Sequence, residues 1–211
     1  MEIYKIGSKG EMVKQIQKAL HLIDDGIYGK ITEEAVKTFQ KENGLKADGI
    51  VGPATLAKML PCRFKKSKRS INLILVHCTA TPEGKNFTVD DIRRWHTTPV
   101  AKGGRGWSDI GYHYVIDTKG KRFDGRDVDL IGAHCEGYNA HSIGIVYVGG
   151  LDKDGKTPKD TRTLTQKAAL LNLLAELRRL YPTAKIAGHR DYNKKGKACP
   201  CFDAKTEYKD I

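Results

Sequence analysis

The stretch INLILVHCTAT, residues 71–81, decides how the larger part of this chain folds. Its first six residues form a short apolar run, which is typical of a buried strand, and the run ends at His77. Three later segments are also expected as strands, at residues 112–117, 142–148 and 185–187. We expect these strands to share one sheet.

Helix signals separate the strands. Residues 88–91 (Thr-Val-Asp-Asp) form a capping box for a helix that runs through Trp95. The strongest helix is expected at residues 164–180, where leucines form one stripe and Pro182 follows the end. Strands that alternate with helices predict a mixed β-sheet flanked by helices, of the α+β or α/β class.

The first sixty residues contain an internal repeat. The segment DGIYGKIT at residues 25–32 recurs as DGIVGPAT at residues 48–55. Each copy is a glycine turn followed by a helix start, with Thr32 expected as a helix cap and Pro53 as a first helical residue. Apolar residues around both copies have helical spacing, so residues 1–60 are expected to form a three-helix domain.

Positive charge is concentrated between the two regions. The chain has 37 Lys and Arg against 25 Asp and Glu, a net charge of +12. Residues 61–70 (PCRFKKSKRS) contain basic but no acidic side chains, which favours a solvated linker and leaves residues 71–211 as a second domain. Such a segment also suits a polyanionic partner, either nucleic acid or an anionic cell-envelope polymer.

Membrane insertion and a disulfide framework are not expected. No apolar run approaches 18 residues, which argues against a transmembrane helix. The first residues lack the apolar segment of a signal peptide, so we expect the protein to stay in the cytoplasm until it is released. Five cysteines without a signal peptide indicate free, buried or metal-bound thiols.

Three separated residues are candidate metal ligands. His77 ends the first expected strand, His189 ends the last, and Cys199 follows in a Lys- and Gly-containing loop. Two imidazoles and one thiolate can hold a zinc ion and leave a fourth position for water. This requires the two strands to be neighbours in the sheet, with their ends at the same edge.

Two sets of motifs resemble known families. The N-terminal set resembles the small peptidoglycan-binding domain, and it comprises GSKGEMVKQIQKAL (7–20), DGIYGKITEEAVKTFQKENGL (25–45) and DGIVGPATL (48–56). The set between about residues 70 and 205 resembles the zinc-dependent type 2 N-acetylmuramoyl-L-alanine amidases, relatives of amidase-type phage lysozymes and peptidoglycan recognition proteins. Its five motifs are HCTAT (77–81), GYHY (111–114), GAHCEGYN (132–139), SIGI (142–145) and KACP (197–200).

The resemblance implies an activity and a set of site residues. Such an enzyme binds zinc (Zn²⁺) through His77, His189 and Cys199. It hydrolyses the amide between N-acetylmuramic acid and the L-alanine of the stem peptide. Tyr112 and Lys197 match the residues expected to stabilise the oxyanion or to move the proton, and which of the two handles the proton is left open.

Three further positions need separate expectations. His134 lies in a loop that resembles a substrate-facing segment, so we expect it in the binding groove. Val146 stands where several relatives have a glutamate, which leaves the Tyr/Lys arrangement of the phage-type branch. Cys201, two residues after Cys199, could compete for zinc or form a redox-sensitive neighbour.

The resulting hypothesis is a monomeric, phage endolysin-like peptidoglycan hydrolase that acts on the cell wall after release. A non-catalytic peptidoglycan-recognition protein is the alternative, and a bacterial autolysin remains open as the source. A nucleic-acid binder with a structural zinc is disfavoured, because no compact Cys/His finger spacing is present. The preferred peptidoglycan type and host are not indicated by the sequence.

Overall fold

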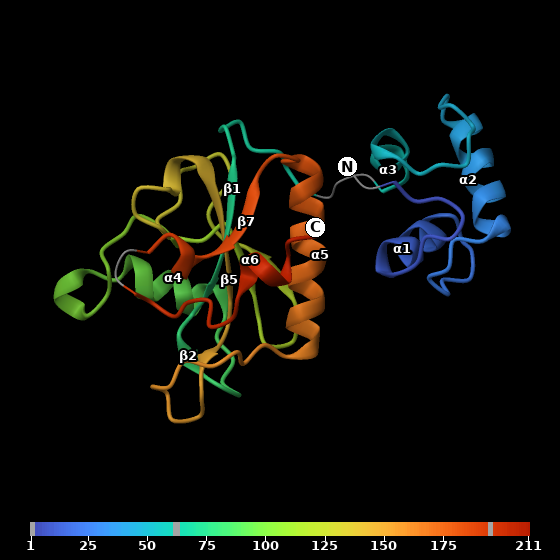
Figure 1. The fold of residues 1–211 in the computed structure, drawn as a ribbon. Helices are drawn as coiled ribbons and strands as arrows, with labels where there is room; N and C mark the ends of the chain where they lie inside the picture. Colours follow the sequence, from blue (N-terminus) through green and yellow to red (C-terminus); the bar gives the residue numbers. More distant parts are fainter. Residues whose placement is uncertain (1–2, 61–63, 194–195) are drawn as a thin grey trace. The chain divides into compact units, whose positions relative to one another are not determined.

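The chain forms two compact units in the computed structural model, Met1–Arg63 and Phe64–Ile211 (Figure 1). The structure describes residues 3–60, 64–193 and 196–211. Within these residues, no helix is both long and apolar enough to cross a lipid bilayer.

The first unit contains three helices, as the repeat predicts. They are α1 (Glu11–Ala19), α2 (Lys30–Glu42) and α3 (Pro53–Met59). Pro53 takes the first helical position of α3 as expected. The helices enclose a small apolar core formed by Val13, Ile16, Tyr28, Val36, Val51 and Met59.

A buried glutamine organises each copy of the repeat. The side-chain amide of Gln17 donates to Asp25 Oδ1, the Ile27 carbonyl and Thr32 Oγ1, at 2.8, 3.0 and 3.3 Å, and its oxygen accepts from Gly26 N–H at 2.9 Å. Gln40 makes the equivalent four contacts with Asp48, Ile50, Thr55 and Gly49. The expectation that Thr32 caps α2 is wrong: the cap position is Gly29, and the Thr32 hydroxyl is buried against Gln17.

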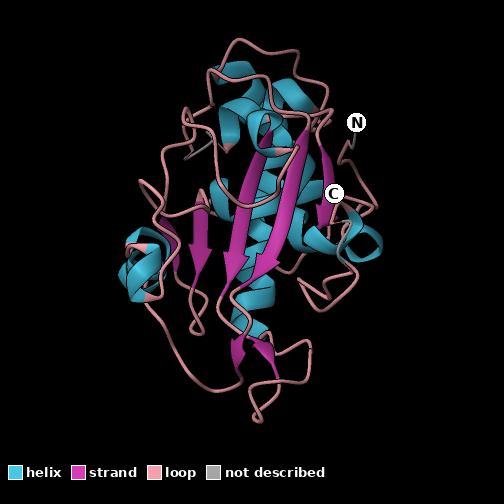
Figure 2. Ribbon diagram, turned by 90° about the vertical axis from the view of Figure 1, so that its left-hand side faces the viewer, coloured by secondary structure: helices cyan, strands magenta, loops and turns pink. Residues whose placement is uncertain are grey.

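The second unit is built on a mixed five-stranded sheet, as predicted (Figure 2). Its strand order is β4-β3-β5-β1-β7. The strands are β1 (Leu73–Cys78), β3 (Tyr114–Ile116), β4 (Arg122–Asp124), β5 (Ser142–Tyr147) and β7 (Lys185–Gly188). Only β4 is antiparallel to its neighbour, and β1 lies between β5 and β7. A separate parallel pair joins β2 (Thr81–Pro82) to β6 (Gly150–Leu151).

Helices pack on both faces of this sheet. The long helix α5 (Leu164–Leu180) contributes its leucine stripe to the largest apolar core, together with alternate residues of β1 such as Ile74 and Val76. Helix α4 (Val89–Thr97) packs on another core through Ile92. The remaining helical segments are α6 (Ala204–Glu207) and three short 3-10 turns, Val100–Lys102, Asn139–His141 and His189–Asp191.

The basic segment differs from a purely solvated linker. Residues from Phe64 onward belong to the second unit, whereas residues 61–63 lie outside the described part of the chain. Ser67 Oγ donates to the Val128 carbonyl at 2.6 Å, and the Arg69 guanidinium donates to the same carbonyl at 2.9 Å. Lys65 forms an ion pair of 2.6 Å with Asp129. These contacts fix the second half of the segment to the sheet unit.

Candidate metal centre and active site

The ends of two neighbouring strands bring both candidate histidines together. Strands β1 and β7 are parallel, with Val76 paired to Gly188. His77 and His189 are the next residues in each strand direction, so their side chains meet at one edge of the sheet. Their ring centroids are 4.5 Å apart. The neighbour relation that the metal hypothesis requires is therefore present.

Cys199 completes a cluster with the two imidazoles. Its Sγ lies 3.9 Å from His77 Nδ1, and one potential ligand atom from each of the three residues lies within 4.8 Å of the others. Both histidines are buried and the cysteine is half-buried. Two nitrogens and one sulfur at this spacing fit the donor set of a zinc site. Within the described residues, this is the one such group of three.

Burial determines the charge of the two candidate histidine ligands. Desolvation, followed by repulsion from His134 and His189, lowers the pKa of His77 well below its usual value. Desolvation also lowers the pKa of His189, with a further contribution from the Lys197 ammonium. Both rings are therefore neutral at pH 7, and each has one nitrogen lone pair available to a metal.

Backbone contacts hold the loop that contains Cys199. The Arg190 N–H donates to the Cys199 carbonyl at 2.7 Å, and the Tyr147 hydroxyl donates to the Pro200 carbonyl at 2.6 Å. The Cys78 N–H also points at Cys199 Sγ, at 3.3 Å. The sulfur is thus fixed from both the loop and the strand.

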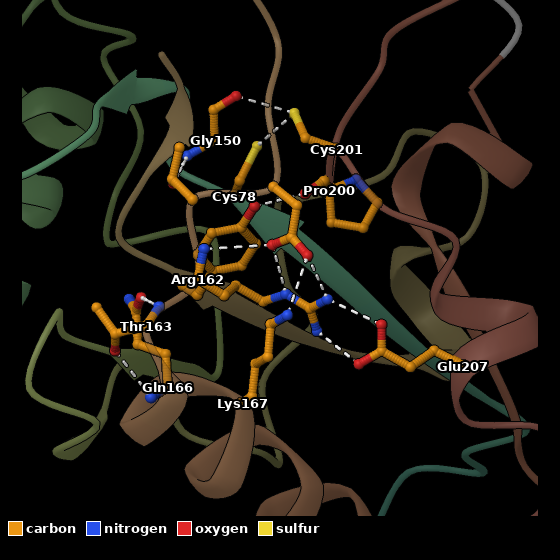
Figure 3. Close-up of polar contacts among 12 residues, drawn as sticks. Cys78, Gly150, Arg162, Thr163, Gln166, Lys167, Pro200, Cys201 and Glu207 are labelled. Atoms are coloured by element: carbon orange, nitrogen blue, oxygen red, sulfur yellow. Dashed lines mark hydrogen bonds and ion pairs between the residues drawn. The ribbon is translucent and has the colours of Figure 1, made fainter. Parts of the chain in front are cut away.

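Cys201 lies in a different environment from Cys199. Its Sγ is 3.7 Å from Cys78 Sγ and donates to the Gly150 carbonyl at 3.0 Å (Figure 3). It does not belong to the group of potential ligand atoms formed by His77, His189 and Cys199. The geometry therefore indicates that Cys201 is a neighbour of the metal centre and not one of its ligands.

Tyr112 and Lys197 both approach the cluster. The Tyr112 ring centroid is 5.2 Å from that of His77, and burial raises the pKa of the phenol, which is therefore a neutral hydrogen-bond donor. The Lys197 ammonium is close enough to contribute to the lowered pKa of His77 and of His189. Val146 pairs directly with His77 in the sheet and is fully buried, so an apolar side chain occupies the position of the missing glutamate.

His134 differs from its expected position in a groove. Its side chain is buried, with 8% of its surface exposed, and its Nδ1 lies 3.1 Å from His77 Nε2. The ring therefore packs behind the candidate ligand. An open hollow beside His189 is lined instead by Tyr138, Asp191, Tyr192 and Asn193, and the side chain of Asn193 lies 3.1 Å from His189 Nε2.

Ser142 had no predicted role, although the SIGI motif begins at this residue. The Ser142 hydroxyl is fully buried and lies 3.3 Å from His134 Nε2. A polar residue at the start of an otherwise apolar strand was the available signal. Together, the fold and the site define a class: a mixed-sheet protein with a His–His–Cys candidate metal centre at the carboxyl ends of β1 and β7.

The chain belongs to the N-acetylmuramoyl-L-alanine amidase family, whose model matches residues 67–202. It is therefore an amidase of peptidoglycan, and it hydrolyses the bond between N-acetylmuramic acid and L-alanine. Residues 9–59 match a peptidoglycan binding domain. Both family resemblances drawn from the motifs are thus confirmed.

Phage proteins and recognition proteins are among its relatives. The endolysin of Enterobacteria phage K11 is 40% identical over 69% of this chain and 89% of its own length, and that of Escherichia phage T7 is 39% identical over 66% and 87%. The amidase LysC of Clostridium intestinale has a similar structure, with a TM-score of 0.52 and 28% identity over 66% of this chain and 82% of its own. Drosophila PGRP-LB gives a TM-score of 0.54 and 27% identity over 72% and 86%.

Proposed function

We propose that this amidase is a zinc-dependent endolysin in which His77, His189 and Cys199 hold the metal. The single observation that carries the proposal is the convergence of two imidazoles and one sulfur within 4.8 Å at the edge of the sheet. When bound there, zinc supplies a Lewis acid that polarises a carbonyl and activates water at neutral pH. The similarity to phage endolysins supports the biological role.

Tyr112 and Lys197 are proposed as the catalytic side chains. The Lys197 ammonium stabilises the negative charge that develops on the amide oxygen of the substrate. Tyr112 enters the reaction as a neutral phenol, because burial raises its pKa, and it donates a hydrogen bond to the reacting group. A Tyr112→Phe variant removes only the phenol hydroxyl, whereas Lys197→Ala removes the charge, so their pH–rate profiles separate the two roles.

The two units are proposed to divide the work. The three-helix domain, residues 1–60, holds peptidoglycan, and residues 71–211 cut it. The segment at 61–70 joins them, with its second half fixed to the amidase unit by the contacts of Lys65, Ser67 and Arg69. We further propose a monomer that accumulates in the cytoplasm and reaches the wall after release. Light scattering of the purified chain tests the monomeric state.

The deciding experiment digests purified cell walls with the zinc-loaded full chain. We expect new L-alanine amino termini without new reducing sugar ends, and one zinc per chain by elemental analysis. Cys199→Ala is expected to lose both the product and the metal, whereas a buffer-matched sample of the wild-type chain retains them. Binding to the walls without any new amino termini would identify the non-catalytic recognition protein instead.

A further inference from the structure

A buried line of hydrogen-bonding groups runs away from the candidate metal centre behind His77. His77 Nε2 lies 3.1 Å from His134 Nδ1, and His134 Nε2 lies 3.3 Å from Ser142 Oγ. The Ser142 hydroxyl in turn lies 2.7 Å from the Tyr138 carbonyl oxygen. The three side chains in this line are buried, with exposed fractions of 1%, 8% and 0% for His77, His134 and Ser142.

The acceptor at the far end of the line determines which group donates and which accepts in each of its hydrogen bonds. The Tyr138 carbonyl can only accept, so the Ser142 hydroxyl donates its single proton there. The Ser142 oxygen is then an acceptor for His134 Nε2–H. A neutral imidazole carries one proton, so His134 Nδ1 is a lone pair and accepts from His77 Nε2–H. His77 Nδ1 is left with its lone pair on the side of Cys199 Sγ, 3.9 Å away.

Both rings are neutral, as this assignment requires. Only 1% and 8% of the surfaces of His77 and His134 are exposed, and burial disfavours the charged, doubly protonated form of an imidazole. A third histidine, His113, packs edge-on against His134, with ring centroids 5.7 Å apart. Each imidazole therefore has one N–H and one lone pair at neutral pH.

Two glycines make room for the His134 ring. A Cβ atom added to Gly144 would lie 2.5 Å from His134 Cδ2, and one added to Gly132 would lie 2.6 Å from the same carbon. The backbone of His134 is also held, because its N–H donates to Asn139 Oδ1 at 2.9 Å. The ring consequently has a defined site between β5 and the loop that precedes it.

We propose that Ser142 and His134 are positioning residues that hold His77 as its Nε2–H tautomer and so present Nδ1 to the metal. This inference rests on the proposed function for the identity of the ion, but the tautomer itself does not depend on a metal. Donation of the non-ligating N–H to a fixed acceptor orients a ligand imidazole, and loss of such a partner typically weakens metal binding about 10–100-fold.

Nitrogen NMR of the metal-free full chain, labelled with ¹⁵N-histidine, tests the tautomers directly. We expect two-bond ¹H–¹⁵N correlations that identify Nε2–H for both His77 and His134, with the signals assigned by comparison with single variants. Detection of Nδ1–H on His77 would overturn the proposal. Because no zinc is present, this result is independent of whether the proposed metal site is correct.

Competition for zinc with a chromophoric chelator tests whether the zinc affinity depends on the hydrogen-bond acceptor at position 134. His134→Leu removes the acceptor and should weaken zinc binding by about 10-fold or more. His134→Gln offers an amide oxygen to His77 and an N–H to Ser142, so it should restore most of the affinity. His141→Gln, outside the line, is the matched control. Equal zinc affinity for the leucine and glutamine variants would contradict a positioning role.

Ser142→Ala also interrupts the line of hydrogen bonds, with a smaller change in side-chain volume. It replaces His134→Leu as the test of the positioning role if that variant does not fold. It is expected to reduce the Nε2–H population of His77 and to weaken zinc binding. An unchanged tautomer together with unchanged affinity would refute the role of Ser142. If the wild-type tautomers are as expected but the wild-type chain binds no zinc, the proposed function fails while the hydrogen-bond order stands.

Discussion

Replacing Arg162 by methionine should destabilise the amidase unit more than any ordinary surface substitution. The Arg162 side chain is 1% exposed and donates two hydrogen bonds to Asp160 and two to Glu207, at 2.8–2.9 Å (Figure 3). It also donates to the Tyr208 hydroxyl at 2.9 Å, and its guanidinium lies 3.2 Å from the centre of the Phe202 ring. These contacts fix the chain that follows Cys199 to the segment before α5.

The magnitude follows from what the substitution leaves behind. Methionine fills a similar volume and keeps the apolar contact with Phe202, but it removes the cation that joins Asp160 to Glu207 and leaves Asp160 only the more distant ammonium of Lys167, at 3.6 Å. Breaking a buried ion pair on one side typically costs about 3–5 kcal/mol. The side chains of Asp160 and Glu207 are 28% and 40% exposed, so water recovers part of this loss. We therefore expect a loss near the lower limit, about 3 kcal/mol, or roughly 6–12 °C in Tm for a unit of this size.

Tryptophan fluorescence during urea unfolding measures the free energy of unfolding of the amidase unit. The chain has two tryptophans, Trp95 and Trp107, and both belong to the amidase unit, so the signal is not affected by unfolding of the three-helix domain. The matched control is Lys167→Met, because Lys167 pairs with the same Asp160 at 3.6 Å but is 46% exposed. That substitution should cost below about 0.5 kcal/mol. A loss under about 1 kcal/mol for Arg162→Met, or equal losses for both variants, would refute the reasoning.

Three further predictions address acid stability and the site. The hydrogen bond from Arg162 lowers the pKa of Glu207, so this stabilisation is complete above the unfolded value of about 4.3 and is lost as the pH falls through the folded value. The stability difference between the wild type and Arg162→Met should therefore shrink between about pH 6 and pH 3 in urea titrations, and a constant difference would contradict this. His77→Ala should lose both zinc and turnover, as elemental analysis and wall digestion would report. Lys197→Ala should keep its zinc but lose turnover, and full turnover would remove its assigned role.

Local patterns were sufficient to predict most of the fold. The apolar runs at 71–76 and 142–148, and the leucine stripe of α5, are decided by neighbouring residues, and each is found as expected. Strand β4 was missed because it has only three residues, too few for an alternation of polar and apolar side chains to indicate a strand. Thr32 was misassigned for a related reason: its buried partner, Gln17, is 15 positions away, beyond the range of a capping pattern.

The sequence was sufficient to predict which residues form the site, but not that the His134 ring is buried. Strand ends and family motifs indicated His77, His189 and Cys199, yet only the parallel pairing of β1 and β7 brings the two histidines to one edge. His134 was expected in a groove because its loop resembles a substrate-facing segment. The two glycines that admit its ring, Gly132 and Gly144, act across the fold, so their effect on its position is not visible in the local sequence.

Strand geometry also explains why a site with several nearby sulfurs presents only one of them to the two imidazoles. Successive residues of β1 point to opposite faces of the sheet, so His77 and Cys78 face different sides although they are adjacent. Cys199 approaches His77 Nδ1, whereas Cys201, two residues later, packs against Cys78 and the Gly150 carbonyl. Cys78 contacts both sulfurs, but of the two only Cys199 belongs with the imidazoles to the group of potential ligand atoms. For Cys201 to act as a ligand it would have to leave the contacts that hold the C-terminal segment, which argues for a three-residue metal centre.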